Sequence, residues 1–345
     1  MSTPAFDARY VRQTRFASLG IEGQARLSRG LAVICGCGAL GTTAANWLVR
    51  AGVGRVRIID RDLVDWSNLH RQVLFDEEDA RQARPKAAAA AEKLRAVNSQ
   101  VEIEPVTVDL SARNVSRLLQ GADVVLDGTD NFETRFLIND YCVREGIPWI
   151  YGGCLEAEGR VMTVLPGETA CLACVVSECP PPGTLPTCET AGVLGPAVGV
   201  VASWQVCEAM KILAGKHHEV TRGLMVFELW QGRARKIAAE RVVGENPCRV
   251  CGRREFAFLQ AGRQAPAVTL CGSNAVQVAP PETQLDPAEM ADRWKGLGEV
   301  SLGEGYARIK TPECELTLFS DGRAIVRGTK DPAMARSWYS RLVGL

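Results

Sequence analysis

The sequence predicts an α/β protein with a doubly wound, Rossmann-like and mostly parallel sheet. Short apolar strands alternate with helical segments up to about residue 151, and a glycine-rich turn follows the first strand. The 345 residues are 46% hydrophobic and 23% charged, which excludes a disordered or fibrous chain. Basic and acidic residues number 40 each, so we expect no general attraction to nucleic acid or to a membrane surface.

The predicted elements alternate in chain order as this fold requires. Apolar runs predict buried strands, and the segments between them have helical composition. The predicted strands are 31–35, 55–59, 101–108, 123–126 and 149–151. The predicted helices are 41–51, 83–97, 113–119 and 133–144, with Pro85 in the first turn of the second of them.

Beyond Gly152 the sequence predicts an antiparallel extension of the sheet. It comprises a strand at 160–165, a long apolar helix at 197–213 and a hairpin of 224–230 with 233–239. We expect a domain boundary near Cys251-Gly252, dividing 1–252 from 253–345. The tail is predicted as a small α+β module with a proline-rich linker at 279–281, a hairpin at 315–326 turning at 320–322, and a helix from Pro332.

The turn Gly36-Cys-Gly38-Ala-Leu-Gly41 has the spacing of a nucleotide-binding turn. Such glycines let the backbone and a helix N-terminus approach a phosphate. Asp60 follows at the end of the second strand, where a carboxylate can accept the ribose hydroxyls. These signals predict nucleotide binding, and alone they also fit an NAD-dependent oxidoreductase.

Acidic, amide and basic side chains then gather after the strand ends. The loop 60–72 contains Arg71, Lys86 opens the next helix, and Asp130 follows the strand at 123–126. The carboxyl ends of parallel strands share one edge, so these side chains predict a phosphate cradle with a carboxylate suited to Mg²⁺. Phosphate chemistry needs such neutralisation of charge, whereas hydride transfer does not.

Two CxxC pairs form a second signal: Cys171, Cys174, Cys248 and Cys251. This spacing predicts a tetrahedral structural zinc site, with redox dithiols or simple buried cysteines as the alternatives. Thirteen cysteines without a signal peptide indicate a reducing cytoplasm and not a disulfide framework. The longest uncharged stretch, 190–207, is read as a buried loop and helix, so no membrane span is expected.

The loop 60–72, the segment Thr129-Asp-Asn131 and Arg9-Tyr-Val-Arg12-Gln13 resemble the ThiF/MoeB/HesA family of ubiquitin-activating-like adenylyltransferases. The resemblance covers roughly residues 6–252. It is greatest to the ThiF branch, which serves thiazole biosynthesis, in the segments 65–68, 131–135 and 148–152.

The resemblance implies ATP-dependent adenylation of the C-terminal Gly-Gly carboxylate of a ThiS-like sulfur-carrier protein, with release of pyrophosphate. That step would prepare thiocarboxylate formation in thiamine biosynthesis; a MoaD-like carrier for molybdopterin or tRNA thiolation is the alternative. It further implies ATP, Mg²⁺ and Zn²⁺ as cofactors, a homodimer, and a cysteine desulfurase as a further partner.

Carried over to this sequence, the resemblance assigns roles to individual residues. Asp60 with the backbone of Gly38 and Ala39 would hold the ribose, and Asp130 would bind Mg²⁺. Arg12 would reach the triphosphate from the partner subunit. The expected catalytic residues are Arg12, Arg71, Lys86, Asp130 and Cys188. The expected ATP-binding residues are Gly36, Gly38, Ala39, Gly41, Asp60, Ser67, Asn68, Arg71, Lys86, Asp130 and Asn131.

Cys188 lies in a proline- and glycine-containing loop, where the family places a cysteine that can take up the acyl group of the carrier through sulfur. A free loop thiol is the alternative interpretation. Two other classes of function stay open at this point: an NAD-dependent oxidoreductase, and a non-catalytic scaffold that binds ubiquitin-like proteins. Cys271 and Cys314 in the tail lack the loop of a rhodanese, so no sulfurtransferase activity is expected there.

Overall fold

The computed structural model describes residues 4–181, 184–188, 190–260, 267–270, 275–278, 284–303 and 305–344. The chain divides into two compact units, Met1–Gly262 and Arg263–Leu345. Each unit has its own sheet and its own hydrophobic core. Within the described ranges, no helix combines the length and the apolar character needed to cross a membrane.

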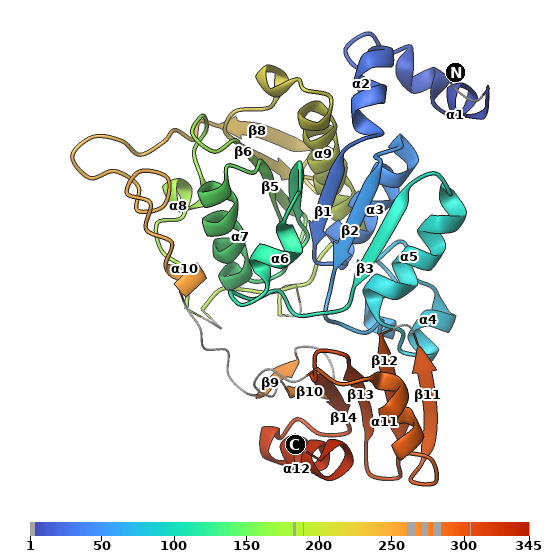
Figure 1. Cartoon of the computed structure of the whole chain (residues 1–345). Helices are drawn as coiled ribbons and strands as arrows, with labels where there is room; N and C mark the ends of the chain where they lie inside the picture. Colours follow the sequence, from blue (N-terminus) through green and yellow to red (C-terminus); the bar gives the residue numbers. More distant parts are fainter. Residues whose placement is uncertain are drawn as a thin grey trace. The chain divides into compact units, whose positions relative to one another are not determined.

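An eight-stranded sheet forms the centre of the first unit, in the order β3-β2-β1-β4-β5-β6-β7-β8 (Figure 1). The strands from β3 to β5 are parallel neighbours, and β5 to β8 pair antiparallel. The predicted doubly wound sheet with an antiparallel extension is therefore confirmed. The strands are β1 (Leu31–Cys35), β2 (Arg55–Ile59), β3 (Glu102–Val106), β4 (Val124–Asp127), β5 (Trp149–Leu155), β6 (Glu158–Val164), β7 (Leu224–Glu228) and β8 (Arg233–Ile237).

Helices pack on both faces of this sheet (Figure 1). One face carries α3 (Ala39–Ala51), α5 (Lys86–Val97) and α9 (Gly195–Leu213). The other face carries α6 (Val115–Leu119), α7 (Phe132–Glu145) and α8 (Leu172–Val175). The remaining helical segments of the unit are α1 (Pro4–Thr14), α2 (Gly20–Leu27), η1 (Trp66–Asn68), α4 (Glu77–Arg81), η2 (His217–Glu219) and α10 (Ala257–Gln260).

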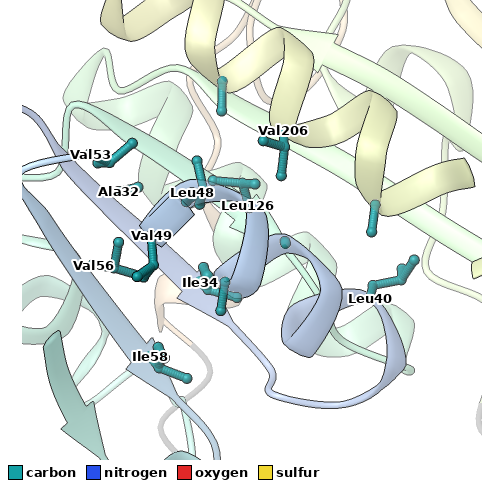
Figure 2. Close-up of a cluster of buried hydrophobic side chains, with 14 of the residues drawn as sticks. Ala32, Ile34, Leu40, Leu48, Val49, Val53, Val56, Ile58, Leu126 and Val206 are labelled. Carbon is teal, nitrogen blue, oxygen red and sulfur yellow. The ribbon is translucent and has the colours of Figure 1, made fainter. Parts of the chain in front are cut away.

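The central strand β1 is buried on both faces, as its uninterrupted apolar sequence predicts. Ala32 and Ile34 pack with α3, α5 and α9, whereas Val33 and Cys35 pack with α6 and α7. Figure 2 shows the first of these clusters, in which the side chain of Ile34 lies among those of α3 and the neighbouring strands. The order of strands reverses between β1 and β4, so a ligand crevice is expected at the carboxyl ends of these two strands.

Some element boundaries differ from the prediction. The helix expected from residue 83 begins at Lys86, because Ala83 has a φ of 44° and Pro85 is extended, with a ψ of 129°. The third strand is Glu102–Val106 instead of 101–108. Helices α1 and α2 were not predicted from the sequence, because their helical stripe is short and interrupted by exposed arginines.

The first unit extends past the expected boundary at Gly252, to Gly262. The segment after the second CxxC pair packs back onto α7: the ring of Phe258 stacks on Phe136 at 5.1 Å between centroids. The backbone N–H of Phe258 also donates to Oδ2 of Asp140 at 3.0 Å. These contacts hold α10 against the first unit. The sequence analysis could not predict them, because the contacting residues are more than a hundred positions apart in the chain.

The second unit is an antiparallel sheet in the order β11-β12-β13-β14-β10-β9, with a core around the fully buried Trp294. The expected hairpin is confirmed as β13 with β14, and the expected terminal helix as α12. Its elements are β9 (Ala267–Leu270), β10 (Ala275–Val278), α11 (Pro287–Arg293), β11 (Glu299–Gly303), β12 (Tyr306–Lys310), β13 (Glu315–Phe319), β14 (Ala324–Arg327) and α12 (Pro332–Val343). The predicted linker at 279–281 and Cys271 lie outside the described residues.

Candidate functional site

The glycine turn joins β1 to α3, and its three glycines have different roles. A Cβ on Gly41 would lie 1.8 Å from the carbonyl oxygen of Gly36, and one on Gly36 would lie 2.5 Å from that of Gly128. Both positions therefore need glycine for close backbone packing. Gly38 is the N-cap of α3 with no side-chain cap, and a Cβ there would meet no atom closer than 3.9 Å. The first N–H groups of α3 are thus left open to an anionic ligand.

Asp60, at the end of β2, fixes the shape of this turn. Its carboxylate accepts hydrogen bonds from the backbone N–H of Cys37 at 2.5 Å and of Asp62 at 2.7 Å. Burial raises the pKa of Asp60 to about 6, and the nearby ammonium of Lys86 opposes that rise. Asp60 is 8% exposed, so it is held rigidly between the turn and the next loop.

The loop after β2 is ordered by its own polar side chains. Asp65 accepts from the N–H of Ser67, and the side chain of Asn68 accepts from the N–H of Asp65, which closes a capping box around η1. The guanidinium of Arg71 donates to the carbonyl oxygen of Ser67 at 2.6 Å. The expected ligands Ser67, Asn68 and Arg71 therefore lie in one compact turn.

Lys86 begins α5 and is 6% exposed. Its Nζ lies 3.2 Å from Oδ2 of Asp62, an acid that was not singled out from the sequence. Burial lowers the pKa of Lys86, but the carboxylates of Asp62, Asp60 and Asp130 outweigh it and leave this pKa above its usual value. A permanent positive charge thus stands at the carboxyl edge of the sheet, within the field of Asp130.

The turn after β4 positions Asp130. The buried Asp127 accepts from the N–H and the hydroxyl of Thr129 at 2.9 and 2.6 Å, and its other oxygen accepts from Arg135 at 3.1 Å. Arg135 also donates to the carbonyl oxygen of Thr129 at 2.7 Å. Asn131 caps α7 by accepting from the N–H of Thr134. Asp130 itself is exposed on this turn, so its carboxylate is accessible to a cation.

Cys188 is brought to the same place by the loop that precedes α9. Its Sγ lies 3.5 Å from the carbonyl oxygen of Cys154 on β5. Burial raises the pKa of the Cys188 thiol; the cations of Arg71 and Arg135 lower it, and Asp130 raises it. The pKa of the Cys188 thiol therefore depends on charged side chains of the expected phosphate cradle. A Cβ on Gly195, at the start of α9, would also lie 3.2 Å from the carbonyl oxygen of His70.

Arg12 does not join these residues within one chain. Helix α1 is held at the far ends of α3 and α5: Gln13 donates to the carbonyl oxygen of Ala51, and Arg9 to that of Val97. The site lies at the other ends of these helices, and α3 alone is about 20 Å long. Figure 1 shows α1 at the opposite end of the first unit from α4.

The four cysteines of the two CxxC pairs meet in space, with all four sulfurs within 4.8 Å of one another. The Sγ atoms of Cys171 and Cys248 are 3.7 Å apart, and those of Cys174 and Cys251 are 3.4 Å apart. A tetrahedron with zinc–sulfur bonds of about 2.3 Å has sulfur–sulfur edges of roughly 3.8 Å. The cluster therefore fits a zinc ion with four thiolate ligands and no open position.

Asp62 and Arg135 support the expected site residues but were not predicted from the sequence. Asp62 was one of several acids in its loop, and Arg135 was named only as part of the segment 131–135, without a role of its own. Asp62 is distinguished by its ion pair with Lys86, and Arg135 by its burial and its ion pair with Asp127; only the folded chain reveals these contacts.

Three comparisons with known proteins agree with this geometry. The model of the ThiF family matches residues 10–249. The sulfur carrier protein ThiS adenylyltransferase of Bacillus subtilis is 42% identical over 338 residues, which are 97% of this chain and 99% of that protein. A sulfur carrier protein adenylyltransferase of Thermus thermophilus is 40% identical over 250 residues, which are 71% of this chain and 90% of that protein.

Solved structures share the fold. The crystal structure of MccB from E. coli with ATP aligns with a TM-score of 0.61 at 23% sequence identity, covering 71% of this chain and 74% of that one. At this level of identity the likeness concerns the fold alone. The part that aligns has the size of the first unit and not of the whole chain.

Proposed function

This chain belongs to the ThiF family, and on that premise we propose that it adenylates a ThiS-like sulfur-carrier protein. The C-terminal Gly-Gly carboxylate of the carrier attacks the α-phosphorus of ATP, and pyrophosphate leaves. The enzyme is then a nucleotidyltransferase that prepares the carrier for thiocarboxylate formation in thiamine biosynthesis. One observation carries the proposal: the bare N-terminus of α3, the buried Lys86 and the exposed Asp130 lie at the carboxyl edge of the sheet, where a ligand crevice is expected.

Each residue has a role that its surroundings support. Asp60, with the backbone of Gly38 and Ala39 beside it, holds the ribose, and the free N–H groups at the start of α3 favour the phosphates. Asn68, Arg71 and Lys86 contact the phosphates, and Lys86 stays charged because three carboxylates surround it. Asp130, with Asn131 beside it, is the ligand for Mg²⁺, which would supply charge neutralisation to the phosphates when bound.

A carboxylate is a weak nucleophile, so the rate of adenylation must come from positioning of the two reactants and from stabilisation of the leaving pyrophosphate. Two reactants held in line gain the advantage of an intramolecular reaction. Each charge-assisted hydrogen bond to pyrophosphate contributes about 1.5–3 kcal/mol, so Arg71 and Lys86 together account for several orders of magnitude in rate. Neither residue needs to exchange a proton in this step.

We further propose a homodimer in which Arg12 reaches the triphosphate bound by the partner subunit. A cysteine desulfurase is the proposed source of sulfur, and the reducing cytoplasm is the proposed compartment. Zinc in the four-cysteine cluster is proposed as structural, because four thiolates leave no position for a substrate. It joins the segment after β6 to the segment that precedes α10.

The test is ATP–pyrophosphate exchange in the presence of purified carriers that end in Gly-Gly, of both the ThiS and the MoaD kind. Exchange should depend on the carrier, and Asp130→Ala and Arg71→Ala should each abolish it. Arg50→Ala is the matched control, since this exposed arginine lies in the last turn of α3, away from the crevice. Full exchange in both site variants would refute the assigned roles, and nicotinamide binding without ATP binding would favour an oxidoreductase.

A further inference from the structure

Two cysteines with half-buried side chains, outside the metal cluster, are neighbours in the described part of the chain. Cys154 is near the end of strand β5, just before the β5–β6 hairpin, and Cys188 is in the loop before α9. The Sγ of Cys188 lies 3.5 Å from the carbonyl oxygen of Cys154. We propose that Cys154 is a resolving thiol for Cys188: it displaces a sulfur-linked group from Cys188 by forming an intrachain Cys154–Cys188 disulfide.

The backbone holds the two segments together on one side of the pair. The N–H of Glu156 donates to the carbonyl oxygen of Gly192 at 2.9 Å, and the N–H of Leu194 donates to that of Glu156 at 2.7 Å. These bonds form a parallel bridge between Glu156 and Val193. The loop carrying Cys188 is therefore tied to the chain two residues beyond Cys154.

This arrangement suits disulfide formation. A disulfide needs Cα atoms about 4.4–6.8 Å apart. Because the Sγ of Cys188 already contacts the backbone of Cys154, we expect side-chain rotation and a movement of the loop to bring the two sulfurs together. Cys154 is fixed in a strand, so the movement falls on the loop. Other thiols of the first unit, such as Cys35, Cys37 and Cys142, are fully buried in its cores and lack access to a sulfur-linked group.

The charges around the pair assign the order of attack. Burial raises the pKa of both thiols, that of Cys154 to about 12. Arg71 and Arg135 favour the thiolate of Cys188 and oppose the effect of Asp130, whereas the neighbour that acts on Cys154 is the Cys188 thiol itself. Cys188 is therefore the residue that first acquires a sulfur-linked group, and Cys154 attacks afterwards.

The substrate class is a mixed disulfide, Cys188–S–S–R. The thiolate of Cys154 attacks the sulfur of Cys188 and the new Cys154–Cys188 bond forms. The S–S bond of the mixed disulfide breaks, and its electron pair leaves with the outer sulfur as R–S⁻. No external oxidant is consumed in this step, and a dithiol reductant restores the two free thiols. The exchange needs no ATP, so it can be measured without adenylation, and its failure would not bear on the proposed adenylation.

The probe is glutathione disulfide, which loads Cys188 by exchange and releases one glutathione thiolate. After treatment and rapid alkylation, peptide mass spectrometry of the full chain should find Cys154 linked to Cys188 and little glutathione on Cys188. In Cys154→Ser the adduct on Cys188 should persist at least about tenfold longer, because an intramolecular thiol reacts at a high effective concentration. Cys207→Ser, which removes an exposed thiol on α9, should behave like the unchanged chain.

Three results would overturn the proposal. These are a stable glutathione adduct on Cys188 of the unchanged chain, equally fast loss of the adduct in Cys154→Ser, and the absence of both adduct and cross-link. The mapping of the unchanged chain does not depend on how well a variant folds. The rate of closure should rise with pH in the alkaline range, as more Cys154 becomes thiolate.

Discussion

A single buried ion pair, between Arg135 and Asp127, holds the turn that carries Asp130. Arg135 and Asp127 are both buried, with Nε and Oδ2 3.1 Å apart, and the guanidinium also lies over the ring of Tyr151. Asp127 ends β4 and Arg135 lies eight residues later on α7, so the two side chains meet only when the turn between them is folded. The pair fixes the backbone around Thr129, so stability and site geometry depend on the same contacts.

Arg135→Ala should lower the free energy of unfolding by about 3 kcal/mol or more, because it leaves the Asp127 carboxylate buried without its cation. Urea denaturation measures the effect. Arg222→Ala breaks an ion pair between Arg222 and Glu168 in which both side chains are more than half exposed, and it should cost less than about 1 kcal/mol. Equal losses in the two variants would mean that the buried pair adds nothing beyond a surface contact.

The position of a candidate site residue could be predicted from the sequence where a motif fixes it to a strand end, whereas its role stays a prediction. Asp60, Arg71, Lys86 and Asp130 all fall at the carboxyl edge, because a parallel sheet brings successive strand ends together. The sequence could not identify Asp62 as the partner of Lys86, since the loop contains several acids and which of them meets Lys86 depends on how the loop folds back on α5.

At the scale of elements, the four-cysteine cluster joins segments that share no strand pairing. One CxxC pair lies at α8, and the other lies between β8 and α10. The chain between β8 and α10 has no helix or strand, and the cluster ties it to the segment at α8. The sequence alone was enough to predict this cluster, because ligand type and spacing define it.

Cys248→Ser should remove bound zinc and lower the melting temperature by roughly 10 °C, since several kcal/mol of metal-coupled stability are lost in a unit where 1 kcal/mol corresponds to about 2–4 °C. Chelation of the unchanged protein should have the same direction of effect. Elemental analysis and thermal unfolding measure both, with Cys207→Ser as the control of unchanged stability and zinc content. Folded, active protein with almost no zinc would show that the cluster is not a metal site.

Element boundaries were predicted less well than element types. The start of α5 moved to Lys86 because a left-handed Ala83 and an extended Pro85 interrupt the helical pattern. The place of α10 depends on stacking with α7, a contact between residues more than a hundred positions apart. Local sequence patterns predict the type of an element from its periodicity and its caps. Where a folded unit ends depends on long-range contacts, which these patterns do not contain.

At the scale of the whole molecule, the position of α1 bears on the proposed dimer. Arg12 is exposed at the end of the first unit away from the crevice, while Tyr10 beside it is buried and bonded to Asn98. The proposed role of Arg12 therefore requires that the triphosphate be bound by another copy of the chain.

Arg12→Ala and Arg71→Ala should each be inactive alone in carrier-dependent exchange. When they are mixed and allowed to exchange subunits, a heterodimer holds one site with both arginines intact. Random pairing in a twofold dimer should then restore about a quarter of the activity of the unchanged protein. No recovery, despite subunit exchange shown by mass spectrometry, would place both arginines in the same site.

The division of the chain into two units predicts that the first unit is active without the second. The second unit has its own six-stranded sheet and its own core around Trp294, and the eight strands of the first unit are paired without it. The similar Thermus thermophilus protein aligns over 90% of its length with only 71% of this chain. A chain ending after Gly262 should therefore fold, keep its zinc and support pyrophosphate exchange. If that chain folds and binds ATP but exchange with the carrier is lost, the second unit takes part in recognising the carrier; if it does not fold, the two units are not independent.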